Sequence, residues 1–287
     1  MLYVNNNETI VAADEFAVGA NSRAYLYGDG VFESIRLRNG VPLNIENHVQ
    51  RLVQGAKALK MRVPIYFTPE FFEIRIRELC KKSGIREGGK CRLSLDRISG
   101  GTYAPISSEV QFFIEVSPIA ENDFQLNLKG HEVDIFTDFK KNFSPISQFK
   151  TKNALVSVLG AIKAQEKQLD DMLLTNDKSQ ILESTNSNLF VVSNSILYTP
   201  PVADGCLAGT MRMQVINLAI KHGIRVYESS ILPSNLLIAD EIFLTNAVKG
   251  ITWVGGYRTK RYFNSVAKRF VGLLNEHSQM EIENKLL

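Results

Sequence analysis

The sequence of 287 residues contains little cysteine, histidine or tryptophan, with three, four and one of each. The cysteines Cys80, Cys91 and Cys206 are odd in number and far apart, without a CxxC pair or a histidine at metal-ligand spacing. Such a set argues against a disulfide framework and against a structural zinc site. We therefore expect no metal, and we expect the dispersed histidines to lie at surfaces or interfaces.

The sequence also lacks a long hydrophobic run and an excess of charge of one sign. Nowhere do roughly eighteen apolar residues follow one another, and MLYVNNNETIVAADEF at the start has no charged segment leading into an apolar one. The formal net charge is +3, and the lysines and arginines are scattered among acids. These features predict a cytoplasmic protein whose partners are small molecules, not nucleic acid or membrane.

Hydrophobic periodicity divides the chain into two parts of mixed helices and strands. The polar stretch AENDFQ marks a boundary near residues 118–124, and we place the domains at 1–120 and 121–287. The first domain is predicted to contain strands over 2–11, 30–45, 91–97 and 110–117, with helices over 49–59 and 69–84. The second is predicted to contain helices over 153–168, 210–222 and 265–276, with strands over 171–175, 180–184, 188–193, 196–200, 224–230, 241–247 and 251–257. Because no regular βαβ repeat occurs, the expected fold class is α+β.

Six short segments follow one another in a fixed order: YGDGVFESIR, NHVQRL, FKTKN, ILESTNSNLF, TPPVADGCLAGTMR and DEIFLTNA. In this order and spacing they resemble the fold-type IV pyridoxal-phosphate enzymes, which include branched-chain aminotransferases, D-amino acid aminotransferases and aminodeoxychorismate lyase. The resemblance runs from about residue 20 to residue 254. It implies a two-domain enzyme of amino acid metabolism with pyridoxal 5'-phosphate in the inter-domain cleft, a larger C-terminal domain that carries the cofactor lysine, and a homodimer.

Two residues carry the chemistry that this resemblance implies. Lys150 matches the lysine that forms a Schiff base with the cofactor, because Asn153 follows it in a K-x-x-N pattern, whereas Lys152 does not fit and its loss is expected to be close to neutral. A lysine attacks a carbonyl as its neutral amine, which partial burial favours, and the same amine can then move a proton. Glu183 resembles the acid that pairs with the pyridine nitrogen and makes the ring an electron sink. Taken alone, either residue could be an ordinary surface charge.

The resemblance also implies the residues that hold the cofactor phosphate. Arg51 resembles an arginine that grips the phosphate in a fork of hydrogen bonds. A glycine turn then opens a helix whose first N–H groups favour a dianion, and a second backbone contact follows a strand. These two contacts comprise Gly209, Thr210 and Met211, and Asn246 and Ala247. The alternatives are a surface ion pair for Arg51 and a plain helix start for the glycine turn.

Three further residues are expected on the substrate side. Tyr27 resembles a tyrosine that lines the substrate pocket and contributes to catalysis, and Arg97 in LDRISGGTY resembles an arginine presented to a substrate carboxylate. Tyr103 in the same loop is a weaker candidate. Tyr27 could instead pack through its ring, and Arg97 could be a solvated loop arginine.

The sequence leaves two reactions of this family open, amino transfer and the lyase reaction. Ala154 follows Asn153 where branched-chain enzymes have a tyrosine, TNA replaces a glycine-threonine pair, and RISGGTY resembles the loop of aminodeoxychorismate lyases. We expect amino transfer between an amino acid and a 2-oxo acid. The alternative is a 4-amino-4-deoxychorismate lyase, which eliminates pyruvate to give 4-aminobenzoate. A third possibility is a cofactor-binding scaffold without turnover, against which the presence of both Lys150 and Glu183 argues.

Overall fold

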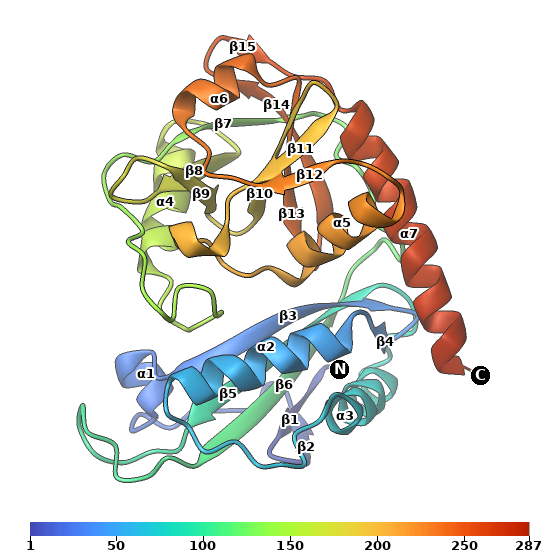
Figure 1. Ribbon diagram of the computed structural model, residues 1–287. Coiled ribbons are helices and arrows are strands. Elements are labelled where there is room, and N and C mark those ends of the chain that lie inside the picture. The colour runs from blue at the N-terminus through green and yellow to red at the C-terminus, as the bar shows by residue number, and fades with distance from the viewer. Residues whose placement is uncertain (287) are drawn as a thin grey trace. The chain divides into compact units, whose positions relative to one another are not determined.

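Figure 1 shows the computed structural model, which describes residues 1–286 and forms two compact units. Unit 1 comprises Met1–Asp123, Phe149–Asn153 and the end of the chain from Met280, and unit 2 comprises Phe124–Gln148 and Ala154–Gln279. The division near residue 123 lies close to the predicted one. It differs from the prediction in assigning the 149–153 segment, with Lys150, to unit 1, because this segment pairs with a strand of that unit.

Unit 1 contains a six-stranded antiparallel sheet in the order β2-β1-β6-β5-β3-β4. Its strands are β1 (Tyr3–Asn6), β2 (Thr9–Ala12), β3 (Gly30–Arg38), β4 (Val41–Pro42), β5 (Gly89–Arg97) and β6 (Val110–Pro118). Its helices are α1 (Arg23–Tyr27), α2 (Ile45–Ala58) and α3 (Pro69–Lys82). Asn39 and Gly40, with φ of 52° and 71°, make the predicted tight turn between β3 and β4.

The core of unit 1 lies between the sheet and the helices α2 and α3, which pack on it (Figure 1). Because side chains alternate along a strand, Val31, Glu33 and Ile35 of β3 point toward the helices, and Phe32 points to the opposite face. Glu33 thus places a carboxylate in a row of buried apolar side chains. Such a group must find partners on the helices.

Unit 2 is built on a nine-stranded mixed sheet. The strands are β7 (His131–Ile135), β8 (Asp171–Thr175), β9 (Ile181–Ser184), β10 (Asn188–Ser193), β11 (Ile196–Thr199), β12 (Val226–Glu228), β13 (Glu241–Asn246), β14 (Gly250–Tyr257) and β15 (Lys260–Arg261). The helices are α4 (Leu155–Glu166), the short 3-10 turn η1 (Val202–Asp204), α5 (Thr210–Lys221), α6 (Pro233–Ile238) and α7 (Ser265–Leu286). Since β9 pairs with both β8 and β10, the strands β10, β13, β14, β7, β8 and β9 close into a ring.

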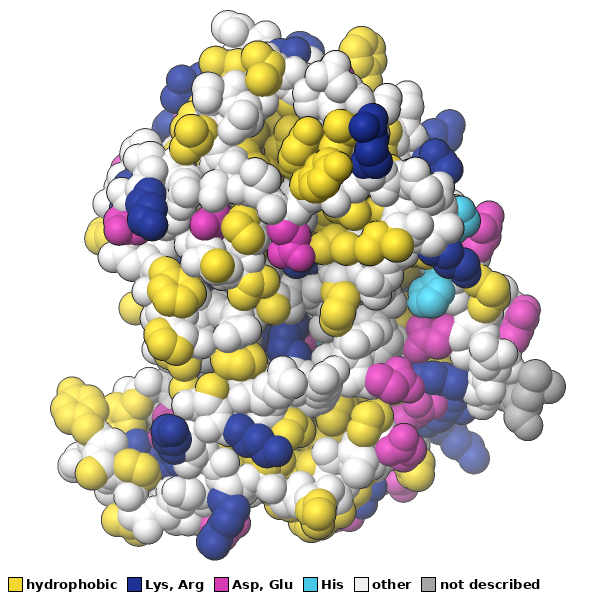
Figure 2. Space-filling view, in the orientation of Figure 1, with side chains coloured by type: hydrophobic (Ala, Val, Ile, Leu, Met, Phe, Trp, Pro, Cys, Tyr) yellow, Lys and Arg dark blue, Asp and Glu magenta, His cyan; other side chains and the backbone are white. Residues whose placement is uncertain are grey.

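Helix α4 packs with its small residues inward and its large apolar residues outward. Gly160 and Ala164 are buried, and a side chain at Gly160 would meet Thr185 and Leu174. Leu155 is 76% exposed, and Val158, Leu159 and Ile162 at helical spacing are also exposed. Figure 2 shows other exposed apolar side chains among interspersed positive and negative charges on the face in view. The outward face of α4 is therefore an exposed apolar stripe.

The predicted elements are present in the structure, with a few differences at short elements and ends. The sequence prediction did not include β7, β15, α1, α6 or η1, and α7 continues to Leu286 where the prediction ended it at residue 276. Each of the five missed elements has six residues or fewer, too few for a periodic pattern to stand out. Among the described residues, no helix combines the length and the apolar character that crossing a bilayer requires.

Candidate active site

Lys150 lies on a short extended segment that pairs with the start of β3. Strand β4 pairs only with the other end of β3. The Phe32 N–H donates to the Lys150 carbonyl at 2.9 Å, the Lys152 N–H donates to the Gly30 carbonyl at 3.0 Å, and Thr151 bridges Val31 in antiparallel fashion. The Lys150 Nζ lies 4.7 Å from the centre of the Phe32 ring. The backbone on both sides of this half-buried lysine is therefore fixed, and its amine lies against an aromatic face.

Lys152, two residues further on, has a buried partner. Its Nζ lies 2.6 Å from Oδ1 and 2.7 Å from Oδ2 of Asp96, a residue of β5 that is only 1% exposed. Burial raises the pKa of Asp96, and the hydrogen bond from Lys152 opposes that shift. Removing Lys152 would leave this carboxylate buried without the cation that contacts it, so we expect a cost to folding that the sequence alone does not signal.

Arg51, on helix α2, forms an ion pair with the carboxylate of Glu33 on β3. The Arg51 Nε donates to Glu33 Oε1 at 2.7 Å, its Nη2 donates to Oε2 at 2.6 Å, and the His48 ring lies 2.7 Å from the same Oε2. Burial alone would raise the pKa of Glu33, but the Arg51 charge and the His48 hydrogen bond lower it to about 2. Arg51 is thus held by a buried ion pair that fixes the plane of its guanidinium.

Glu183 lies on β9 in unit 2, one residue before the strand ends, and is 7% exposed. Its Oε2 accepts a hydrogen bond of 2.8 Å from the Leu207 N–H, and its Oε1 forms an ion pair with Lys141. Each carboxylate oxygen carries two lone pairs, so both can accept a further donor. The sequence did not indicate a role for Lys141. A lysine in the stretch FKKNF gives no local signal that it will contact Glu183, 42 positions away.

Asn188 lies beside three residues of unit 2 that are predicted to contact the cofactor: Glu183, Gly209 and Asn246. In the sheet it stands opposite Glu183 on β9 and opposite Thr245 on β13, next to Asn246. Its Nδ2 donates to the Leu207 carbonyl at 2.8 Å, and a Cβ placed on Gly209 would lie 1.8 Å from its Oδ1. A side chain at position 209 would therefore force Asn188 to move, and the start of α5 lies close against the row that carries Glu183.

The side chain of Asn246 forms hydrogen bonds within unit 2. The Oδ1 atom accepts from the Val248 N–H at 2.9 Å and the Lys249 N–H at 3.3 Å, and Nδ2 donates to the Asn186 carbonyl at 2.7 Å. These bonds shape the turn through Ala247. The expected backbone contact from Asn246 and Ala247 to a ligand stays a prediction.

Tyr27, Arg97 and Tyr103 line one cavity of about 260 Å³ in unit 1, together with Asn153. The rings of Tyr27 and Tyr103 pack with their centres 5.4 Å apart. Arg97 is neither solvated nor presented alone, since its Nε donates to Asp29 at 2.8 Å and its Nη2 donates to the Leu59 carbonyl at 2.6 Å. As placed, the guanidinium forms part of the cavity wall, and several of its donors are already engaged.

Arg23 also lines this cavity and was missed by the sequence analysis. Its Nε donates to Asp29 at 2.8 Å, and its remaining nitrogens donate to the carbonyls of Gly100, Thr102 and Tyr103. Burial tends to raise the pKa of Asp29, but hydrogen bonds from the two arginines lower it overall. One guanidinium therefore holds the loop that carries Tyr103 against α1, a role that no local pattern in the sequence signals.

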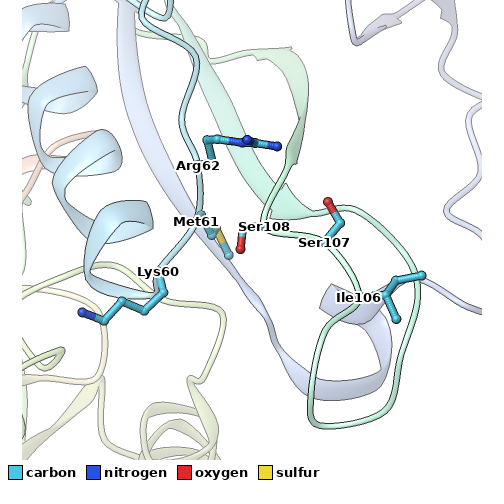
Figure 3. Close-up of a pocket in the computed structure, with 6 residues that line it drawn as sticks. All are labelled: Lys60, Met61, Arg62, Ile106, Ser107 and Ser108. Atoms are coloured by element: carbon cyan, nitrogen blue, oxygen red, sulfur yellow. The ribbon is translucent and has the colours of Figure 1, made fainter.

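A second hollow is lined in part by the end of this loop that precedes β6 (Figure 3). Its lining residues come from the segment that follows α2 and from the loop that precedes β6: Lys60, Met61, Arg62, Ile106, Ser107 and Ser108. None of the predicted site residues is among them. We therefore assign it no part in the site.

Comparison with known proteins places these features in a family. A family model described as amino-transferase class IV matches residues 30–256. A protein of Methanocaldococcus jannaschii, provisionally named a branched-chain-amino-acid aminotransferase, is 30% identical over 259 residues, which cover 87% of this chain and 85% of the relative. The D-alanine aminotransferase of Bacillus licheniformis is 26% identical over 290 residues, covering 98% and 96%.

Solved structures give the same picture of the fold. An aminotransferase from Brucella abortus bound to pyridoxal 5'-phosphate superposes with a TM-score of 0.86 at 23% identity, covering 96% of this chain and 99% of that one. A Legionella pneumophila protein provisionally named a 4-amino-4-deoxychorismate lyase superposes with a TM-score of 0.80 at 26% identity, covering 92% and 96%. These likenesses confirm the predicted α+β fold.

Proposed function

Because this chain belongs to the amino-transferase class IV family of pyridoxal 5'-phosphate enzymes, we propose that it transfers an amino group between an amino acid and a 2-oxo acid. Lys150 is the amine that binds the cofactor covalently. The observation that carries this assignment is the fixed, half-buried position of Lys150 at the edge of β3, with Nζ 4.7 Å from the Phe32 ring. An aromatic face and partial burial suit an amine that must react in its neutral form.

The residues of unit 2 fit the ring and the phosphate of this cofactor. When bound, the cofactor supplies an aldehyde carbon that reacts with amines and a ring that withdraws electrons. Glu183 keeps lone pairs for the ring nitrogen, and its position is fixed by the Leu207 N–H. Gly209 lacks a side chain, so its backbone stays accessible at the start of α5. The first N–H groups of this helix attract a dianion.

Unit 1 contributes a cation and a proton carrier. Arg51 is proposed to bind the phosphate, with Glu33 holding its guanidinium in one orientation. The Lys150 Nζ is proposed to accept the proton from the substrate Cα, as a general base held by its backbone.

The substrate is proposed to enter the cavity of about 260 Å³ in unit 1 that Tyr27 and Tyr103 line. Two arginines share one aspartate at this cavity, so the Arg23, Arg97 and Asp29 cluster carries a surplus positive charge. A carboxylate substrate is attracted by that surplus even though the donors of Arg97 are partly engaged. Tyr27 supplies a phenol at the wall of the cavity.

We further propose that the protein forms a homodimer, which the resemblance implied. The apolar stripe on α4, with Leu155, Val158, Leu159 and Ile162 exposed, supports a protein partner. Leu159→Glu places a charge in this stripe and is expected to lower the molar mass measured by light scattering from dimer to monomer. Gln165→Glu on the same helix is the control and should stay dimeric. A wild-type protein that is monomeric at micromolar concentration would contradict the proposal.

The lyase reaction is a second candidate, supported by the 26% identity to the Legionella protein over 92% of this chain. Its substrate carries carboxylates and a ring that becomes aromatic in the product. The rings of Tyr27 and Tyr103 could pack against this ring. The loop that carries Tyr103 is also the part of the sequence that resembles lyases.

One assay separates these reactions. The holoenzyme is incubated with D- and L-amino acids paired with 2-oxo acids, and in parallel with aminodeoxychorismate, and the products are measured by chromatography. A new amino acid formed in equal amount to the donor consumed supports amino transfer. Pyruvate released from aminodeoxychorismate without an amino acceptor supports the lyase. A protein that binds the cofactor and forms neither product would be a scaffold, contrary to the proposal.

A further inference from the structure

Two lysines compete in principle for the same chemistry in unit 1. Lys150 and Lys152 are two residues apart on an extended segment, so their side chains leave it on the same side. The two amines have the same intrinsic reactivity toward an aldehyde. Some feature of the structure must therefore select one of them.

The Lys152–Asp96 ion pair is built across strand β3. Gly30 lies directly opposite Asp96 in the β3–β5 register, and Lys152 pairs its own N–H with the Gly30 carbonyl on the other side. A Cβ on Gly30 would lie 2.3 Å from the Asp96 Oδ1. The absence of a side chain at Gly30 thus opens the path by which Lys152 reaches over β3 to a carboxylate on the next strand.

The position of this pair anchors the segment that carries Lys150. The backbone of the segment is held to β3 by hydrogen bonds around one isolated bridge, a shorter pairing than that between two full strands. The ion pair adds a side-chain contact to β5, where Asp96 is 1% exposed and the Lys152 side chain is 19% exposed. An ion pair so well shielded from water is costly to break by removing one partner.

We propose that Asp96 acts through Lys152 as a positioning pair: it fixes the segment so that Lys150 meets the cofactor, and it withholds Lys152 from the same reaction. This inference rests on the function proposed above. The Lys152 ammonium that donates to Asp96 has no lone pair to offer to a carbonyl carbon. The segment that this pair holds carries Lys150, whose Nζ lies over the Phe32 ring.

The test traps the lysine that has reacted. Each lysine that condenses with the cofactor aldehyde loses water, and borohydride then delivers hydride to the new C=N carbon and leaves a stable secondary amine. Peptide mapping by mass spectrometry locates this amine. In wild type it should lie on Lys150. In Asp96→Asn, which removes the charge and keeps the shape, a measurable fraction should appear on Lys152, and the rate of attachment at Lys150 should fall on the order of tenfold.

A second variant and a control separate positioning from general damage. Lys152→Arg keeps a cation for Asp96 and should restore attachment at Lys150, whereas Lys152→Ala should lower both the attachment rate and the melting temperature, by roughly 4–10 °C. Lys167→Ala breaks another Lys–Asp pair, 2.9 Å long and in unit 2, and should leave attachment unchanged. Exclusive attachment at Lys150 with wild-type rates in both Asp96→Asn and Lys152→Ala would overturn the inference. A wild-type protein modified at neither lysine would instead overturn the proposed function, while the melting temperatures would still test the ion pair.

Discussion

Arg51 is predicted to have two separable roles, one in stability through Glu33 and one in binding the cofactor. Glu33 is fully buried, with its pKa lowered from 4.5 to about 2. A difference of roughly 2.5 pKa units corresponds to about 3 kcal/mol of stabilisation of the ionised carboxylate. Arg51→Ala leaves this carboxylate buried without its cation and should lower the free energy of unfolding of the cofactor-free protein by about 3 kcal/mol at pH 7, measured by urea denaturation.

A double variant isolates the second role. Arg51→Ala with Glu33→Gln removes the uncompensated charge, and it should regain about 1–2 kcal/mol of the lost stability. Cofactor affinity should not recover, because losing one partner of a charge-assisted contact costs about 2–4 kcal/mol whatever becomes of Glu33. Titration of the cofactor-free proteins measures this. If the double variant regained wild-type affinity, Arg51 would act only through folding and the assignment to the phosphate would fail.

The pH dependence of stability provides an independent check on the Glu33 ion pair. The folded pKa of Glu33 is lower than its unfolded value, so its contribution is present above pH 4.5 and is lost as the pH falls from 4.5 toward 2. The stability difference between wild type and Glu33→Gln should shrink from about 3 kcal/mol at pH 7 to about 1 kcal/mol at pH 3. A difference that stays constant over this range would refute the reasoning.

Three further variants test the neighbouring contacts. Glu183→Gln should keep the cofactor bound but lower kcat by at least about tenfold, since a neutral amide no longer holds a proton on the ring nitrogen; an unchanged kcat would exclude that pairing. Gly209→Ala should lower stability by about 1–3 kcal/mol in thermal unfolding and weaken cofactor binding, because its Cβ meets Asn188. Arg23→Ala should raise KM for carboxylate substrates with little effect on cofactor affinity, since it frees the Tyr103 loop; equal KM values would remove the loop from the substrate site.

Much of the fold could be predicted from the sequence because its longer elements have clear periods and boundaries. The Asn39-Gly40 turn and the helix starting at Pro69 after Thr68 have local signals, and both formed as expected. The membership of Lys150 in unit 1 had no such signal. It depends on an isolated bridge to β3, which joins residues about 120 positions apart in the sequence.

The candidate site divides in the same way. Order and spacing of short motifs were enough to single out Lys150, Glu183 and Gly209, whose contacts are now visible within their own units. Lys141, which pairs with Glu183, and Arg23, which holds the loop of Tyr103, were not foreseen. A lone arginine or lysine has many possible partners, and only the folded chain shows which carboxylate or carbonyl it reaches.

The most direct test of the central claim is to locate the cofactor on the wild-type protein. Holoenzyme reduced with borohydride is digested, and the modified peptide is identified by mass spectrometry. The account predicts a single modified residue, Lys150, and loss of the cofactor's visible absorbance in Lys150→Ala while the far-ultraviolet spectrum of the fold is retained. Modification at a different lysine, or a Lys150→Ala protein with full turnover, would contradict it.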